Sequence, residues 1–391
     1  MTAPTAIEIK ASAKLPLGMP AQAFMRDYWQ KRPLLIRGAF AGFQPPMSGN
    51  DLAGLACEEG VLARIVSFDR KRDRWQLENG PFPEDRFLHM GKRDWTLLVQ
   101  DVDRWDADVA KLLAHFAFLP RWRIDDIMVS FAAPGGSVGA HVDHYDVFLL
   151  QGFGQRHWAI DARPDAPLDT REDAPIKLLG SFTATHDWVL DPGDMLYLPP
   201  GVPHHGVAVD ACLTFSIGMR APSVGELLVA WAEERGRELG DARRYGDPDQ
   251  RAVSEPGLVD TAAITRVRAA LTSALTADDA ELANFFGRFL STYRLADTAP
   301  RKVRAVTESA IAARLHKGRA LMPSPSVRLS FIEHPEGARL FGAGESLDLT
   351  RAAASACTRG RPIDAAWWDM ASAADHAGVR AVVERGWVVF A

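Results

Sequence analysis

Two histidines and one aspartate have the residue types and the setting of a metal site. His141 and Asp143 form a His-x-Asp pair, which follows a turn-rich approach containing Pro134 and several glycines. If this pair begins a strand, alternate side chains face the same way, so His141, Asp143 and Tyr145 share one face. His204, after a later turn, would complete two imidazoles and one carboxylate. Such a facial set leaves neighbouring coordination positions open and is typical of non-haem Fe(II) oxygenases.

Each part of this candidate site has a neighbouring residue or pair that could bind the metal in its place. A second His-x-Asp pair, His144 and Asp146, follows the first, but the glycine-rich turn directly precedes the first pair. By strand alternation Asp146 points away from the site, which favours a structural role. At the other end, His205 adjoins His204. The turn at residues 199–201 fixes the backbone just ahead, which favours His204 as the ligand and His205 as its outward neighbour.

An iron oxygenase of this kind also needs a cosubstrate that supplies electrons. A keto acid such as 2-oxoglutarate must be held by its distal carboxylate, and the planar fork of an arginine suits this role. Arg156 lies one hairpin beyond the metal pair and could fold back beside it, although a strand arginine is usually a surface residue. Ser130 either donates a further hydrogen bond to the cosubstrate or bonds to backbone. Tyr145 either lines the substrate channel or fills the barrel.

Short apolar segments separated by glycine and proline surround these residues. Such a pattern favours a β-sandwich or barrel over alternating βαβ units. We expect a double-stranded β-helix, which is a jelly-roll barrel whose open mouth can hold a metal between two short sheets. A helix is expected from Asp106 to Phe118, ended by Pro120. The expected strands are Trp95–Gln100, Phe148–Leu150, Arg156–Ile160, Trp188–Leu190, Met195–Leu198 and Leu213–Met219.

The pattern changes after Arg220. Ser223 and Glu226 form a capping box before an apolar run with helical spacing, so a helix begins there. The chain is predicted to comprise a jelly-roll domain (1–220), a helical domain whose apolar faces could form a dimer (221–297) and a small α+β winged-helix-like domain (298–391). Further helices are expected near 259–275, 279–293, 350–357 and 363–375, with strands beginning at Val327 and closing the chain at 387–390.

Composition narrows the class of protein. The 391 residues carry a net charge of −5, so no global charge points to nucleic acid or acidic membranes. From Arg301 onward there are 13 basic against 9 acidic residues, which permits a contact with RNA although no basic cluster supports it. The three isolated cysteines form neither a disulfide framework nor a zinc motif. No signal peptide or membrane-spanning run is expected, which fits a cytoplasmic protein.

The motifs together resemble those of the JmjC-type 2-oxoglutarate oxygenases. More narrowly, the chain is similar to bacterial ribosomal oxygenases that hydroxylate an arginine of large-subunit ribosomal protein L-sixteen. The matching stretches are residues 28–36, 125–158, 190–206 and 215–222.

The resemblance implies Fe(II) on His141, Asp143 and His204, and 2-oxoglutarate held by Arg156 and Ser130. It also implies a homodimer formed by the middle helices, and a ribosomal protein as the partner. The chain departs from the family where His144 and His205 replace other polar residues.

Three functions remain open at this point. The first is an Fe(II)- and 2-oxoglutarate-dependent protein hydroxylase, which acts on an arginine of the ribosomal 50S subunit and releases succinate and CO2. The second is an N-methyl-lysine demethylase of the same chemistry, which would release formaldehyde. The third is a non-enzymatic cupin that binds the ribosome or RNA, for which Arg156 has no evident purpose.

Overall fold

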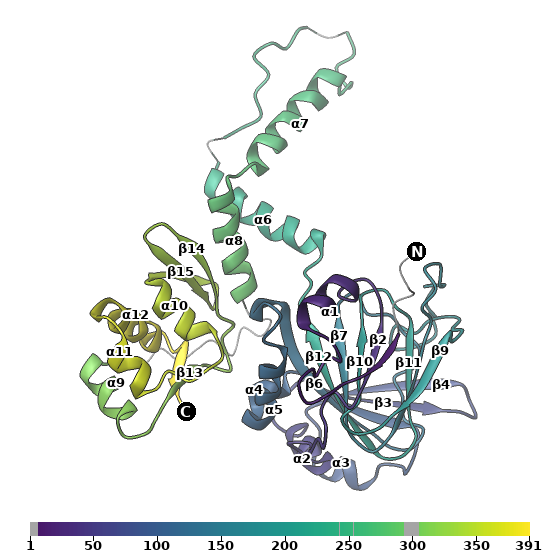
Figure 1. The fold of residues 1–391 in the computed structure, drawn as a ribbon. Helices are drawn as coiled ribbons and strands as arrows, with labels where there is room; N and C mark the ends of the chain where they lie inside the picture. Colours follow the sequence, from purple (N-terminus) through teal and green to yellow (C-terminus); the bar gives the residue numbers. More distant parts are fainter. Residues whose placement is uncertain (1–6, 242, 253, 293–304) are drawn as a thin grey trace. The chain divides into compact units, whose positions relative to one another are not determined.

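The computed structural model describes residues 7–241, 243–252, 254–292 and 305–391 (Figure 1). The chain separates into two compact units, Met1–Ala221 and Pro222–Ala391, and each unit has a hydrophobic core of its own. The predicted boundary between residues 297 and 298 lies outside the described residues. Within the described ranges, no helix is both long and apolar enough to cross a lipid bilayer.

A nine-stranded sheet forms the larger layer of the first unit. Its neighbouring strands are antiparallel except for the pair β1 and β2. One face of the sheet packs on the main core, which includes Phe24, Phe148, Tyr197 and Phe215. In spatial order the strands are β1 (Glu8–Lys10), β2 (Leu34–Arg37), β10 (Met195–Leu198), β7 (Val147–Phe153), β12 (Cys212–Met219), β6 (Ile124–Ala132), β5 (Trp95–Val99), β3 (Ala63–Asp69) and β4 (Arg74–Asn79).

A smaller antiparallel sheet forms the second layer of this unit. It consists of β11 (His204–Ala208), β8 (Arg156–Ile160) and β9 (His186–Leu190), with β8 in the middle. A second core cluster joins side chains of both sheets, among them Leu149, Trp158 and Leu196. The two facing sheets confirm the jelly roll predicted from the short strands.

The predicted helix from Asp106 to Phe118 has a different form in the structure. Asp106 caps the start by accepting hydrogen bonds from the backbone of Asp108 and Val109. The α-helical part, α5 (Ala107–Lys111), then tightens into a 3-10 helix, η1 (Leu112–Phe116). Apolar spacing fixes which side chains are buried but does not distinguish these hydrogen-bond patterns. The other helices of this unit are α1 (Ala21–Asp27), α2 (Gly49–Leu55), α3 (Asp85–Leu88), α4 (Val102–Trp105) and the 3-10 helix η2 (Arg121–Arg123).

Three helices open the second unit: α6 (Val224–Leu239), α7 (Thr261–Leu275) and α8 (Asp279–Ser291). The predicted capping box is present, because Ser223 accepts from the backbone of Glu226 while Glu226 accepts from the backbone of Ser223. Trp231 of α6 donates its indole hydrogen to the carbonyl of Leu275 at 3.0 Å, which joins α6 to the end of α7.

The C-terminal segment combines helices with small sheets, as predicted for a winged-helix-like fold. The predicted single helix over 363–375 is wrong, because the structure has two helices there. Ser372 begins the second one through a capping box with Asp375, a sequence signal that stops one helix and starts another. The elements are α9 (Glu308–Leu315), β13 (Leu321–Pro323), β14 (Ser330–His334), β15 (Gly337–Gly342), β16 (Glu345–Leu349), α10 (Arg351–Thr358), α11 (Ala365–Met370), α12 (Ala373–Glu384) and β17 (Val388–Phe390).

Candidate metal centre

The candidate ligands lie on a loop and on the first residue of a strand. The connection from β6 to β7 contains His141 and Asp143. Of these two residues, His141 forms a β-bridge, to His204 of β11. In this bridge each backbone N–H donates to the other residue's carbonyl at 3.0 Å. The prediction that the His-x-Asp pair begins a strand is therefore wrong. The bridge, rather than strand alternation, brings the two imidazoles together.

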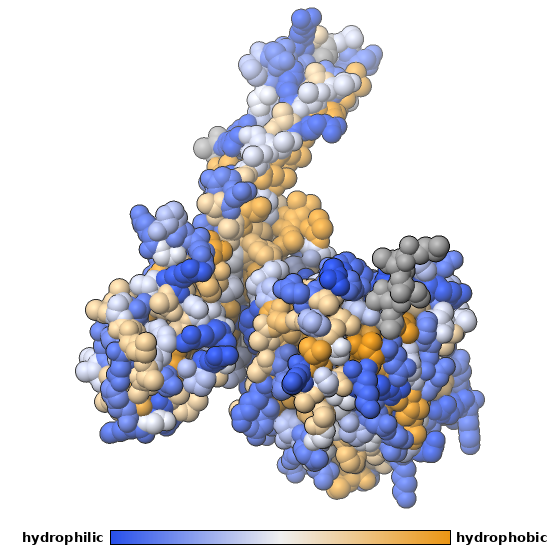
Figure 2. Space-filling model, viewed as in Figure 1, coloured by the Kyte–Doolittle hydropathy of each residue, from blue (hydrophilic) through white to orange (hydrophobic). Residues whose placement is uncertain are grey.

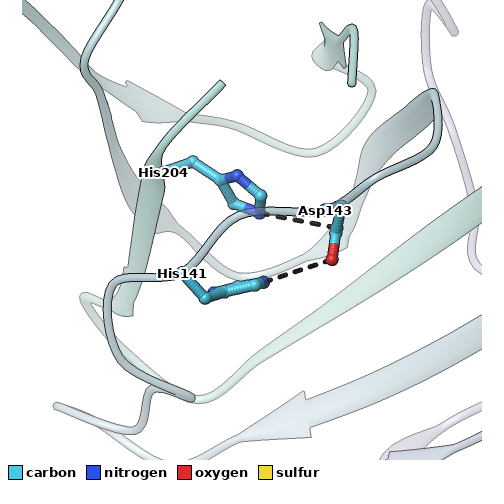
Figure 3. Close-up of side chains that lie close together, drawn as sticks. All are labelled: His141, Asp143 and His204. Atoms are coloured by element: carbon cyan, nitrogen blue, oxygen red, sulfur yellow. Dashed lines mark ion pairs between the residues drawn. The ribbon is translucent and has the colours of Figure 1, made fainter. Parts of the chain in front are cut away.

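The three side chains converge on one point (Figure 3). The Nε2 atom of His141 lies 3.9 Å from Oδ1 of Asp143, and Nε2 of His204 lies 3.7 Å from Oδ2. The two imidazole centroids are 4.2 Å apart. One ligand atom of each residue lies within 4.8 Å of the others. These are the spacings expected of donors that share one metal ion.

Each imidazole is oriented for a metal by a backbone carbonyl. His141 Nδ1 lies 3.0 Å from the carbonyl of Gly139, and His204 Nδ1 lies 2.9 Å from the carbonyl of Val202. A carbonyl can only accept, so Nδ1 carries the hydrogen in each ring and Nε2 keeps its lone pair. Burial lowers the pKa of His204, and the neighbouring His141 lowers it further. The imidazole of His204 is therefore in the neutral form that binds a metal.

Two glycines allow the loop and the turn to approach. Gly139 has a φ of +77°, and a Cβ there would lie 2.4 Å from the side chain of Leu178. Gly201 has a φ of +82° and donates its N–H to the carbonyl of Asp143 at 2.8 Å. Other residues rarely adopt this left-handed conformation. The turn before His204 thus holds the backbone of Asp143, the candidate carboxylate ligand.

Arg156 is a buried charge without an acidic partner among the described residues. It is 3% exposed, its Nε has no hydrogen-bond partner, and its Nη2 donates only a 3.3 Å bond to the carbonyl of Gly206. The guanidinium also lies 4.9 Å from the ring centre of Trp158. Burial lowers the pKa of Arg156. Because an unpaired buried charge is costly, this side chain is suited to an anion that the protein itself does not provide.

The register of the small sheet places Gly206 between the positions of Arg156 and His204. Arg156 pairs with Ala208 and Ile160 pairs with His204, so Gly206 lies on β11 between the two. A Cβ at Gly206 would lie 2.8 Å from Nε of Arg156 and 2.7 Å from the ring of Trp158. The missing side chain of Gly206 therefore leaves the space that the guanidinium occupies beside β11.

Ser130 lies on β6, in the larger sheet. It is buried and is paired with Thr214 of β12 and Leu98 of β5. Cys212, two residues before Thr214 on the same face of β12, is close enough to influence the pKa of Arg156. Ser130 and Arg156 therefore approach the same interior from opposite sheets.

Comparisons with known proteins agree with this geometry. Residues 111–227 match the JmjC domain model, residues 274–384 match a ROXA-like winged helix, and residues 182–295 match an AraC-like ligand binding domain. The ribosomal protein uL16 3-hydroxylase of Escherichia coli is 38% identical over 275 residues, which are 69% of this chain and 71% of that protein. This chain is a JmjC-domain ribosomal oxygenase.

Further relatives belong to the same group. A probable ribosomal oxygenase of Haemophilus influenzae is 40% identical over 55% of this chain and 53% of that protein. The solved structure of YcfD, a ribosomal oxygenase from Escherichia coli, in complex with cobalt and 2-oxoglutarate is 32% identical, with a TM-score of 0.80, over 95% of this chain and 98% of that one. This structural similarity extends over nearly the whole chain, so it covers the winged helix as well as the jelly roll.

The remaining predicted residues of this oxygenase have different surroundings. Tyr145 is 42% exposed, which fits a place at the mouth of the site better than a filler of the barrel. His205 is on the opposite side of β11 from His204 and meets the ring of Phe182. His144 is exposed, and Asp146 is fully buried and bonded elsewhere, so this alternative His-x-Asp pair is not assembled as a metal site.

Sequence reasoning missed one acidic residue of the ribosomal oxygenase near this mouth. Burial raises the pKa of Asp126 to about 7, and the nearby carboxylates of Asp101 and Asp125 contribute. The charge of Asp126 also helps to raise the pKa of Tyr145, after burial and the charge of Asp143. Asp126 and Asp143 are therefore both near Tyr145. The adjacent acids Asp125 and Asp126 in a buried strand were the available signal.

Proposed function

We propose that this ribosomal oxygenase is an Fe(II)- and 2-oxoglutarate-dependent hydroxylase of an arginine side chain in ribosomal protein uL16. The reaction would release succinate and CO2. The observation that carries the proposal is the cluster of His141, Asp143 and His204 beside the buried, unpaired charge of Arg156. The substrate follows the Escherichia coli relative, which is a uL16 3-hydroxylase.

Iron would be held by Nε2 of His141, Nε2 of His204 and one oxygen of Asp143. Two neutral imidazoles and one carboxylate fit Fe(II) and leave three neighbouring positions open. With 2-oxoglutarate and O2, bound Fe(II) supplies the oxidising power to insert one oxygen atom into an unactivated C–H bond. The part of these three residues is to fix the geometry, and Gly139 and Val202 fix the imidazole tautomers.

Arg156 would hold the distal carboxylate of 2-oxoglutarate. A guanidinium can make two parallel charge-assisted hydrogen bonds to one carboxylate. Its Nε and most of its donor capacity are not used by the described residues. Ser130 would donate a further hydrogen bond through its hydroxyl, from the facing sheet. The ring of Trp158, whose centre lies 4.9 Å from the guanidinium, would help to hold that group in position. The apolar walls around this charge exclude water from the reaction.

The mouth of the site supports a cationic substrate side chain. Asp126 and Asp125 lie on β6 near Tyr145, and Tyr145 in turn lies near Asp143. A guanidinium entering there would meet the ring of Tyr145 and the carboxylate of Asp126, which together favour an arginine. Tyr145 would line the passage between this acid and the metal.

A product assay separates hydroxylation from the alternative demethylation. The enzyme is supplied with Fe(II), 2-oxoglutarate and either a uL16 peptide or an N-methyl-lysine peptide, and both formaldehyde and peptide mass are measured. A hydroxylase adds one oxygen atom to the arginine peptide and releases no formaldehyde. Formaldehyde from the methyl-lysine peptide, with no change in the uL16 peptide, would replace the proposal with the demethylase.

The partners proposed for this oxygenase are the ribosomal protein and a second copy of the chain. The helical segment α6–α8 carries exposed apolar side chains, and Figure 2 shows hydrophobic surface along these helices. Such surface supports a homodimer through this segment. We place the reaction in the cytoplasm, where ribosomal proteins are made. The apolar residues concerned are Val224, Leu228, Val229, Ile264, Val267, Leu271 and Leu282.

A further inference from the structure

We propose that Asp146 is a positioning residue, which holds the two metal-bearing segments at their working separation through Tyr197. The inference rests on the metal centre of the proposed function. Asp146 follows Asp143 by three residues and is 0% exposed. A fully buried carboxylate persists only when its surroundings fix it, so its contacts show what it holds together.

Three side chains from separate parts of the chain bind this carboxylate. Its Oδ1 accepts a hydrogen bond from the hydroxyl of Tyr197 at 2.6 Å. Its Oδ2 accepts from Nε2 of Gln30 at 3.0 Å and from Nη2 of Arg123 at 3.0 Å. Arg123 is thus an ionic partner that is itself largely buried. The network joins the end of the N-terminal helical turn, the residue before β6 and the strand β10.

The Tyr197 hydroxyl is fixed in direction by a second hydrogen bond. It accepts from the backbone N–H of Gln30 at 2.8 Å while it donates to Asp146. Gln30 lies three residues beyond the end of α1 and adopts a left-handed φ of +56°. The ring of Tyr197 stacks on Trp29 at 6.0 Å between centroids, and Arg123 lies 5.3 Å from the Trp29 ring centre.

Tyr197 is placed on the strand that leads to the other histidine ligand. It lies on β10, directly before the turn that continues to His204. Asp146 lies at the end of the loop that carries His141 and Asp143, one residue before β7 begins. The hydrogen bond between Tyr197 and Asp146 therefore connects the segment of one imidazole with the segment of the other two ligands.

The metal carboxylate depends on this indirect support. Among the described residues, no donor hydrogen-bonds to the side chain of Asp143, whose neighbours are the imidazole nitrogens 3.7 and 3.9 Å away. Its backbone is held at one point, where Gly201 N–H donates to its carbonyl. The next fixed points are the bridge at His141 and Asp146, whose carbonyl accepts from the N–H of Met219 at 2.9 Å and whose carboxylate binds Tyr197, Gln30 and Arg123. Without Asp146, the loop between them has one support fewer at the position that aims Asp143.

Metal affinity tests the inference without using the hydroxylation reaction. Co(II), a spectroscopic substitute for Fe(II), is titrated anaerobically into the full-length chain and its visible absorption is followed. Tyr197→Phe removes the 2.6 Å bond but keeps the pair of Asp146 and Arg123. Asp146→Asn removes the charge. We expect each variant to raise the half-saturating Co(II) concentration about tenfold, as loss of support for metal ligands commonly does. The double variant should bind no more weakly than the weaker single variant.

Asp194→Asn is the matched control. Asp194 is also buried and also pairs with an arginine, Arg37, at 2.8 Å, but it stands at the opposite end of β10. It should bind Co(II) as the wild type does, even if its melting temperature falls. Circular dichroism identifies folded variants, and Tyr197→Phe retains the buried ion pair in case Asp146→Asn fails to fold.

The outcomes separate the inference from the function on which it rests. Weaker Co(II) binding by folded Tyr197→Phe, with Asp194→Asn unchanged, supports the positioning role. Wild-type affinity in Tyr197→Phe and Asp146→Asn would overturn that role and leave the metal centre intact. Failure of the wild type to bind Co(II) would overturn the metal centre and the positioning role together.

Discussion

At the scale of single residues, Arg156 and Asp126 are two charged groups whose surroundings disfavour the charge. Arg156 is buried beside Trp158 with no acidic partner among the described residues. Burial raises the pKa of Asp126, although its Oδ2 accepts a hydrogen bond from the backbone N–H of Asp101. A protein tolerates such groups when a ligand completes them. In the proposed function, Arg156 would bind the cosubstrate and Asp126 would bind the substrate.

Removal of the Arg156 guanidinium should have opposite effects on the stability of the protein and on its affinity for 2-oxoglutarate. In Arg156→Met we expect the unliganded protein to be at least as stable as the wild type, because a costly unpaired charge is gone. The half-saturating 2-oxoglutarate concentration should rise at least about 100-fold, since two charge-assisted bonds of roughly 1.5–3 kcal/mol each are lost. Thermal melting and succinate release measure the two effects. Unchanged 2-oxoglutarate affinity would remove Arg156 from the site.

The raised pKa of Asp126 predicts a pH dependence of substrate use. Asp126 is neutral below its pKa of about 7 and ionised above it. Since a guanidinium prefers the ionised form, kcat/KM for the arginine peptide should rise with pH through about 7. Asp126→Asn should lower kcat/KM and flatten this rise, while half-saturation by 2-oxoglutarate stays the same. An unaltered pH profile in Asp126→Asn would exclude the contact.

The sign of the stability effect follows from the same pKa. In the folded protein the pKa of Asp126 is raised above its ordinary 3.8, so between these values the folded form holds a proton that the unfolded chain has lost. Stability from this group is therefore present at low pH and is lost as pH rises towards about 7. The sequence shows which residues form the His-x-Asp motif, but it does not show that the carboxyl group of Asp126 is buried.

At the scale of elements, the sequence predicts more of the strands than of the loops between them. β8 and β10 have the predicted bounds because short apolar runs end at glycine and proline. The segment of His141 to Asp146 was wrongly predicted as the start of a strand, since alternation of side chains does not reveal whether a partner strand is present. The bridge between His141 and His204 joins residues far apart in sequence, so no local pattern could show it.

Gly206 lies where β11 contacts β8, so a substitution there should affect cosubstrate binding. In Gly206→Ala the added methyl group would meet Arg156 and Trp158 at distances below 3.0 Å, so one of these side chains must move. We expect weaker 2-oxoglutarate binding, by about tenfold or more, with Co(II) affinity close to that of the wild type. Gly54→Ala in α2, where a Cβ meets nothing within 4 Å, is the control. Equal 2-oxoglutarate binding in both variants would contradict the close packing.

At the scale of the whole molecule, three domains were predicted, whereas the structure separates into two compact units that meet at Ala221 and Pro222. The predicted end of the jelly roll lies one residue from this point, since a change from short strands to capped helices marks it. The split of the last predicted helix at Ser372 was missed although its capping box is visible in the sequence.

The exposed apolar side chains of α6 and α7 lead to a prediction about assembly. If they form the dimer contact, Leu228→Asp combined with Leu271→Asp should reduce the mass in solution from two chains to one, because two charges would be buried without partners. Light scattering after gel filtration measures this. Leu88→Asp, at a more exposed leucine of α3, should leave the dimer intact. A wild type that is already monomeric would rule out the dimer.

Mass spectrometry can show whether this oxygenase hydroxylates a uL16 peptide that contains the candidate arginine, after exposure to O2 with enzyme, Fe(II) and 2-oxoglutarate. We expect the gain of one oxygen atom on that arginine, with an equal amount of succinate formed, and loss of both in His204→Ala and Arg156→Ala. Succinate formed at the full rate without any change in peptide mass would contradict the proposed substrate. A modified arginine in His204→Ala would contradict the proposed metal centre.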